Sequence, residues 1–280
     1  MKFFAISTFA LILLTAAGAL AKMTNDFVGA VIQGRQLAQQ ILEQRPANNF
    51  TNTGVLKIRD ANGKTLEVPV QCAVVVTATN WWSDYQAFLT NGTETLRIVP
   101  SSVQANQELI GGPDSKISQP VYVVNLTNEY SGPWIFYSHN FPTTGRSNDV
   151  RLSNSITTSS ETSFAGSDFS IGDLGLEFFH WPQQKILKHE MRRGRPCQVL
   201  ESRNPDPSPD GYSRVVSWID NETLGIVQAE AYDAKGKLLK EFYPKSFKKV
   251  NGQWELQEME IRNDQTGSRT RLEFDLKRLD

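Results

Sequence analysis

The feature that most constrains this chain is its C-terminal part, where candidate strands follow one another with only short connections. The strands are predicted at 184–192, 196–203, 212–219, 225–232, 237–249, 253–263 and 268–279. Turn-forming pairs such as Asn251-Gly252 and Thr266-Gly267 lie between them. Because short connections join antiparallel neighbours, the segment 184–279 is predicted to form a β-meander.

The last of these strands indicates that the sheet is one-sided. Its residues alternate between Thr270, Leu272, Phe274 and Leu276 on one face and Arg269, Arg271, Glu273, Asp275 and Lys277 on the other. Such alternation is typical of a strand with one face in water and one face covered. The meander therefore needs a second layer from elsewhere in the chain.

Two segments can supply that layer. Residues 24–45 carry apolar side chains at helical spacing and stop at Pro46, which predicts an amphipathic helix. Residues 168–181 have an S-x-x-D capping pattern from Ser170 to Asp173 and are predicted to form a second, shorter helix. Between the two helices, hairpins are predicted over 54–138 and a polar loop over 141–166. The fold class is thus mainly β with helices (α+β).

The N-terminus has the layout of an export signal. Residues 1–21 begin with Lys2, continue with an apolar stretch and end in Ala19-Leu20-Ala21, which predicts a secretory signal peptide cleaved before Lys22. The remaining residues, 22–280, are expected to form a single domain. In an oxidising compartment Cys72 and Cys197 could pair, or they could be two separately buried thiols, and the sequence leaves both arrangements open.

Candidate catalytic and metal-binding residues are sparse. The three histidines, His139, His180 and His189, do not stand at the spacing of a zinc-ligand pair, and the sequence contains no nucleophile elbow or phosphate-binding loop. We therefore predict no catalytic residues, no metal and no cofactor, and do not expect an enzyme. With 29 Lys and Arg against 30 Asp and Glu, the chain also lacks the basic excess typical of nucleic-acid binding.

The region from Gly166 to Asp280 resembles the LolA-like family of outer-membrane lipoprotein-sorting proteins. The matching segments, in the family's order, are GSDFSIGDL (166–174), GRPCQVLES (194–202), YSRVVSWIDNETL (212–224), AEAYDAKGKLLKEF (229–242) and MEIRNDQTGSRTRLEF (259–274). The resemblance implies a curved antiparallel incomplete β-barrel with an N-terminal helix and a short helical lid on its concave face. It also implies a periplasmic protein that binds lipoprotein acyl chains or another lipid.

From the resemblance we expect Phe169, Ile171 and Leu174 on the lid side of an apolar cavity. The spacing of the second helix adds Phe178, and the matched strands add Trp218, Leu272 and Phe274. Two functions remain in competition. One is a lipid or lipoprotein carrier in outer-membrane sorting or transport, with an inner-membrane export complex as a possible partner. The other is an envelope regulatory or scaffold protein that uses the same fold to bind a protein or to sense lipoproteins.

Overall fold

The structure is a computed structural model that describes residues 26–100, 121–127, 135–137, 160–250 and 253–276. The predicted signal peptide, residues 1–21, lies outside the described residues. Most of the predicted polar loop, 141–166, does so as well, and only its last residues, from 160 onward, are described.

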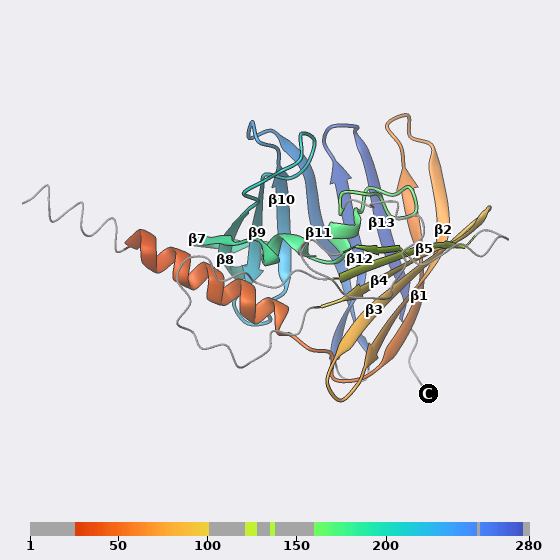
Figure 1. Cartoon of the computed structure of the whole chain (residues 1–280), viewed down its shortest axis with the longest axis horizontal. Helices are drawn as coiled ribbons and strands as arrows, with labels where there is room; N and C mark the ends of the chain where they lie inside the picture. Colours follow the sequence, from red (N-terminus) through yellow and green to blue (C-terminus); the bar gives the residue numbers. More distant parts are fainter. Residues whose placement is uncertain (1–25, 101–120, 128–134, 138–159, 251–252, 277–280) are drawn as a thin grey trace, which may run out of the picture.

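The described residues form one large antiparallel sheet (Figure 1). Its strands are β1 (Phe50–Arg59), β2 (Thr65–Val76), β3 (Trp81–Leu89), β4 (Gly92–Val99), β5 (Val121–Thr127), β6 (Ile135–Tyr137), β7 (Gln183–Arg192), β8 (Arg195–Arg203), β9 (Arg214–Asp220), β10 (Ile226–Tyr232), β11 (Leu238–Val250), β12 (Gln253–Asn263) and β13 (Ser268–Asp275). Their order is β6-β5-β4-β3-β2-β1-β13-β12-β11-β10-β9-β8-β7. The predicted C-terminal meander is confirmed strand by strand.

The sheet consists of two meanders joined in the middle. Strands β1 to β6 form one and β7 to β13 the other, and β1 pairs with β13. Strands β6 and β7 are the two edges and do not meet, so the curved sheet is an incomplete barrel, as predicted. Hairpin turns at Asn62-Gly63 and Asn91-Gly92 lie within the segment 54–138 for which hairpins are predicted, and both glycines adopt the positive φ that such turns favour.

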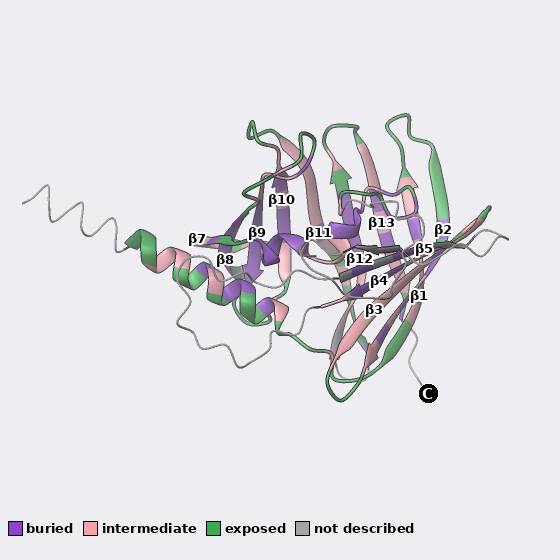
Figure 2. Ribbon diagram, in the orientation of Figure 1, coloured by how far each residue is buried: buried purple, intermediate pink, exposed green. Residues whose placement is uncertain are grey.

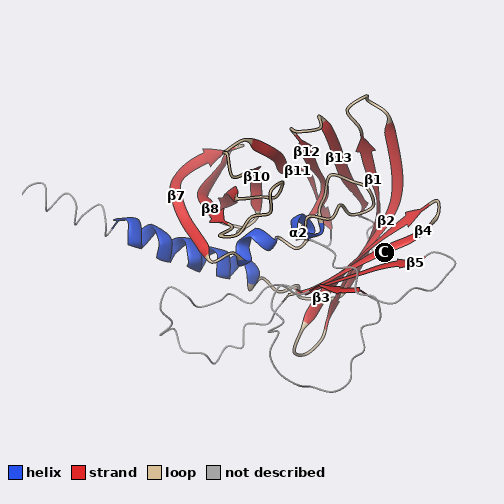
Figure 3. Cartoon of the chain, turned by 45° about the horizontal axis from the view of Figure 1, so that its top comes forward, coloured by secondary structure: helices blue, strands red, loops and turns tan. Residues whose placement is uncertain are grey.

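The N-terminal helix, residues 26–42 in the described chain, lies across the β7–β10 part of the sheet (Figures 1 and 3). Leu37, Ala38 and Ile41 are buried against it, and a Cβ on Gly34 would lie 2.5 Å from the Lys185 backbone nitrogen. Only glycine permits this close approach. The predicted apolar face is buried only in its C-terminal half, because Phe27 is 55% exposed (Figure 2).

The single helix predicted at 168–181 is wrong in detail. The segment contains a short α-helix, α2 (Ile171–Leu174), followed by a 3-10 turn, η1 (Glu177–His180). The predicted capping box of Ser170 and Asp173 begins α2. The helix then ends at Gly175, and Leu176 has a left-handed φ of 50°, so the backbone cannot continue as one helix. We call residues 160–181 the lid.

Two apolar clusters lie under the concave face. In the first cluster, the lid packs against strands of both meanders. Its buried side chains Phe169 and Ile171 lie in one cluster with Leu56, Leu96 and Leu272. The second joins the N-terminal helix and η1 to the β7–β10 strands. The sheet is therefore covered in two places by two different segments, and the space between those covers forms the cavity described below.

Charged side chains gather on the convex face of β12 and β13, and one carboxylate among them is fully buried. Glu260 on β12 has no exposed surface, and it accepts hydrogen bonds from Tyr243 Oη (2.5 Å), Arg262 Nε (2.9 Å) and Arg271 Nη2 (2.9 Å). Burial alone would raise the pKa of Glu260. These hydrogen bonds outweigh burial and lower the pKa from 4.5 to about 2.

The Glu260 pKa predicts a pH-dependent stability. Because the folded-state pKa lies below the unfolded value, the stabilisation is fully present above about pH 4.5 and is lost as the pH falls toward 2. We expect Glu260→Gln to lower the free energy of unfolding by about 3 kcal/mol at pH 7 and by less at pH 3, measured by urea denaturation.

Glu222→Gln is the matched control, since Glu222 is an exposed carboxylate that also pairs with an arginine, Arg195, at 3.2 Å. An exposed pair of this kind contributes only about 0–1 kcal/mol. Equal losses of stability in the two variants would contradict the prediction that the Glu260 hydrogen bonds stabilise the fold.

Candidate ligand-binding cavity

An open hollow of about 1690 Å³ lies on the concave side, between the sheet, the C-terminal end of the N-terminal helix and the lid. Its walls are largely apolar, and they include Ile41, Val74, Phe169, Leu174, Phe242, Leu256, Met259, Phe274 and Leu276. Pockets that enclose drug-sized ligands measure roughly 300–1,000 Å³. The hollow therefore has room for a large apolar molecule.

One titratable group in the wall of the hollow is the Cys72 thiol. Burial raises the pKa of the Cys72 thiol to about 12, so this cysteine is not a thiolate nucleophile at neutral pH. Both Cys72 and Cys197 are buried free thiols, which settles the open pairing question in favour of separate thiols. Among the described residues, no three His, Cys, Asp or Glu side chains are grouped as a metal site requires.

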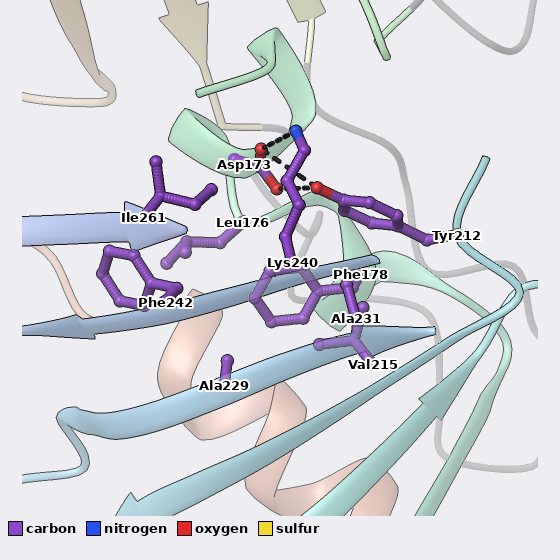
Figure 4. Close-up of a pocket in the computed structure, with 10 residues that line it drawn as sticks. All are labelled: Asp173, Leu176, Phe178, Tyr212, Val215, Ala229, Ala231, Lys240, Phe242 and Ile261. Carbon is purple, nitrogen blue, oxygen red and sulfur yellow. Dashed lines mark hydrogen bonds and ion pairs between the residues drawn. The ribbon is translucent and has the colours of Figure 1, made fainter. Parts of the chain in front are cut away.

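A much smaller cavity, about 30 Å³, lies where the lid meets β9 to β12 (Figure 4). Apolar side chains from the lid, Leu176 and Phe178, meet Phe242 and Ile261 there. A space of this size accepts a water molecule but no larger ligand. We therefore treat it as part of the lid contact rather than as a binding site.

The lid is attached to the sheet by a half-buried polar cluster around Asp173 (Figure 4). Tyr212 Oη donates to Asp173 Oδ1 at 3.0 Å, and Lys240 Nζ lies 3.1 Å from Asp173 Oδ2. The carboxylate also accepts from the Ser170 amide at 2.8 Å. Burial raises the pKa of Tyr212 well above 10, so the phenol remains a donor at neutral pH. The charge on α2 is thus fully partnered.

A second attachment lies shortly before α2 in the lid. The Asp168 amide donates to Thr270 Oγ1, and Thr270 Oγ1 donates back to Asp168 Oδ2, both at 2.9 Å. Ser268 Oγ donates to Asp168 Oδ1 at 2.5 Å, and Lys240 Nζ donates to the Asp168 carbonyl at 2.8 Å. Lys240 therefore contacts both attachments, and the lid is fixed to β11 and β13 by side chains.

Close backbone contacts set the position of the rest of the lid. A Cβ on Gly175 would lie 2.4 Å from the ring of Tyr122 on β5, so glycine is needed where the lid approaches that strand. Farther along, the buried Gln184 side chain donates to the carbonyls of Phe178 and Trp181, both at 2.9 Å. Gln184 thereby satisfies the carbonyl groups at the end of η1.

The structure brings several of the predicted cavity residues together. Phe169, Leu174 and Phe274 line the large hollow, and Phe178 lines the small cavity beside it. Ile171 and Leu272 are on the same side of the sheet but are packed in the first apolar cluster, 1% and 2% exposed, behind the cavity wall.

Trp218 is placed elsewhere. It packs with Cys197, Val199 and Val216 on the opposite face of the sheet, and its indole Nε1 donates to Glu190 at 2.5 Å. The other face of β9 carries Val215 and Ile219, which pack in the cluster of the N-terminal helix. The expectation that Trp218 faces the cavity is corrected by this placement.

Sequence reasoning missed the polar attachments of the lid. The residues concerned are Asp168, Asp173, Tyr212, Lys240 and Thr270. All of them lie in the segments that carry the family resemblance: two in GSDFSIGDL, and one each in YSRVVSWIDNETL, AEAYDAKGKLLKEF and MEIRNDQTGSRTRLEF. The signal was that these residues lie in segments that all match one family, and contact between those segments could have been proposed from it.

Comparison with known proteins supports the fold. A DUF1329 family protein from Desulfovibrio piger superposes with a TM-score of 0.63, at 20% identity over 90% of this chain and 93% of that one. A protein described as an outer membrane lipoprotein-sorting domain, from Vibrio parahaemolyticus, gives 0.55, at 20% identity over 88% and 92%. A LolA superfamily protein from Nitrosomonas europaea gives 0.46 at 14% identity, over 88% and 94%.

A family model described only as an uncharacterized protein matches residues 148–280, and no curated protein matches the chain. The first two structural matches show that this chain has the fold of the lipoprotein-sorting domain, as the sequence resemblance implies. At such low identity, the matches establish the fold alone.

The attachment through Asp173 predicts a measurable change in lid opening. Asp173→Asn removes the negative charge beside Lys240 and weakens the hydrogen bond from Tyr212. A hydrogen bond to a charged group contributes about 1.5–3 kcal/mol, so backbone amides in 169–176 should exchange about tenfold faster or more. Hydrogen–deuterium exchange by mass spectrometry measures this rate.

Asp233→Asn serves as the control, because the Asp233 carboxylate accepts, among the described contacts, from the amides of Lys235 and Lys237 within the β10–β11 turn. That variant should leave exchange in the lid unchanged. Equal acceleration in both variants would show that the Asp173 contacts do not specifically hold the lid.

Proposed function

We propose that this protein binds the acyl chains of lipoproteins or of another lipid and carries them in outer-membrane sorting or transport. The observation that carries the proposal is the hollow of about 1690 Å³ with its largely apolar walls. Apolar walls without a reactive group favour binding by exclusion of water over catalysis. The proposed role is therefore that of a carrier rather than an enzyme.

The lid provides a physical route for loading and release. It packs on the hollow through Phe169 and Leu174, whereas Asp168 and Asp173 fasten it to the sheet. Apolar contacts have no fixed geometry, so the lid can open when the two polar attachments separate together with the apolar contacts of Phe169 and Ile171. Loading would then depend on whether the free energy of ligand binding exceeds the free energy needed to break the contacts of the lid.

One further observation is consistent with this role: the solved lipoprotein-sorting domain from Vibrio parahaemolyticus has the same fold. The signal peptide expected at residues 1–21 supports a periplasmic location. Within the described residues, no helix is long and apolar enough to cross a membrane. The alternative role as a scaffold or sensor predicts a self-filled interior, and a hollow of this size favours the carrier.

Uptake of a fluorescent fatty acid by the delipidated mature protein tests the proposal. We expect saturable binding with a rise in probe fluorescence, because the probe moves from water into the hollow. A protein that is folded by circular dichroism and gives no fluorescence rise at any concentration would contradict the carrier function.

Leu174→Glu tests the location of the site. A carboxylate at this position would face the apolar hollow, so we expect the affinity for the probe to fall by about tenfold or more, with the sheet still folded. Leu187→Glu is the matched control, because Leu187 on β7 is 42% exposed and does not line the hollow. Equal affinities for the two variants would remove α2 from the binding site.

A further inference from the structure

Two exposed phenylalanines lie at one end of the hollow. Phe50 at the start of β1 is 45% exposed, and Phe247 near the end of β11 is 54% exposed, and both line the hollow. The register pairs Thr53 with Asp275 and Phe247 with Leu256. Both phenylalanines therefore lie at the end of the sheet where β13 finishes near the C-terminus (Figure 1). At this end of the molecule, two aromatic side chains of the hollow wall are in contact with water.

The same end of β11 is basic. Lys248 and Lys249 are exposed and directly follow Phe247 in the chain, and Lys248 Nζ donates to the Leu276 carbonyl at 2.6 Å. The acids on the neighbouring strands include Glu255, which is half-buried in the hollow opposite Lys248, and Asp275, which is exposed. Lys245, two residues before Phe247, lies 3.9 Å from the buried Glu260 and is not counted with them.

We propose that Phe50, Phe247, Lys248 and Lys249, here called the mouth patch, dock on the surface of an anionic lipid bilayer. Exposed aromatic side chains insert at the boundary between headgroups and acyl chains, and neighbouring lysines bind anionic headgroups. The proposal rests on the proposed function and adds the place of loading. With the mouth against the bilayer, an acyl chain passes from membrane to hollow while remaining out of water.

The position of the patch favours a bilayer over a protein surface. Phe50 and Phe247 line the hollow and are also exposed to water, so a surface that contacts them also adjoins the hollow. A bilayer supplies both the anionic surface for the lysines and the apolar ligand for the hollow. The overall charge of −1 does not oppose this docking, because the lysines are concentrated on one strand end.

Co-sedimentation of the mature protein with vesicles tests the inference. We expect binding to phosphatidylglycerol vesicles that weakens at high salt, and much weaker binding to phosphatidylcholine vesicles. Lys248→Glu combined with Lys249→Glu should reduce binding to the anionic vesicles by about tenfold or more, since each lysine contributes about fivefold. Lys235→Glu, in the β10–β11 turn at the opposite end of the sheet, should leave binding unchanged.

A second pair of variants tests the aromatic residues of the mouth patch. Phe50→Ser should weaken vesicle binding by roughly tenfold. Phe88→Ser is the control, because Phe88 is 44% exposed, nearly the same as Phe50, but lies at the far end of β3. Circular dichroism establishes that each variant is folded. Equal losses in the two variants would overturn the proposal.

Failure of the docking proposal and failure of the carrier function give different results. Lys248 and Lys249 do not line the hollow, so their variant should take up the soluble fatty-acid probe as the unaltered protein does. Normal probe uptake without binding to either vesicle overturns the docking proposal and assigns the patch to a protein partner. Vesicle binding that depends on the patch, in a protein that takes up no probe, supports docking and contradicts the carrier function.

Discussion

The pairing of β1 with β13 is the constraint on which the rest of the structure depends. It joins residues 53–59 to residues 269–275 and so makes one sheet of two meanders that would otherwise be separate. A Cβ on Gly54 would lie 2.2 Å from the Glu273 carbonyl oxygen, so the close approach of the strands requires glycine there. Lys57 Nζ lies 2.6 Å from Glu273 Oε2 on the convex side of the same pair.

Once the two meanders form one curved sheet, its concave face is larger than any single helix can cover. The N-terminal helix covers the β7–β10 part, and the lid packs on both meanders near their junction. The remaining concave surface becomes the hollow. The hollow is therefore a consequence of the sheet's size, and its apolar walls are the inward-facing residues that each strand would carry in any one-sided sheet.

Much of this architecture could be predicted because its signals are local. Strand alternation in β13 placed Leu272 and Phe274 on the covered face, and turn residues located the hairpins. Strand β9 carries no such signal, since Val215 to Asp220 are buried on both faces, and this is why the side occupied by Trp218 could not be predicted. The break in the lid depends on Leu176, whose left-handed backbone no residue pattern indicates.

The polar attachments of the lid were beyond sequence reasoning for a different reason. Asp173 and Lys240 are 67 positions apart, and Asp168 and Thr270 are 102 apart, so their contact depends on the finished sheet. Without those contacts, the lid segment appears in the sequence only as a weak apolar helix. The structure shows instead a segment with apolar residues facing the hollow and acidic residues fastened to the strands.

The most direct test of this account is native mass spectrometry of the mature protein, purified without detergent from the periplasm of a bacterial host. The account predicts a population heavier than the polypeptide by the mass of one or more lipids. Leu174→Glu should reduce that population, and Leu187→Glu should not. A protein that carries no lipid in any preparation, and does not acquire it when incubated with lipid extracts, would contradict the claim that the hollow is a lipid-binding site.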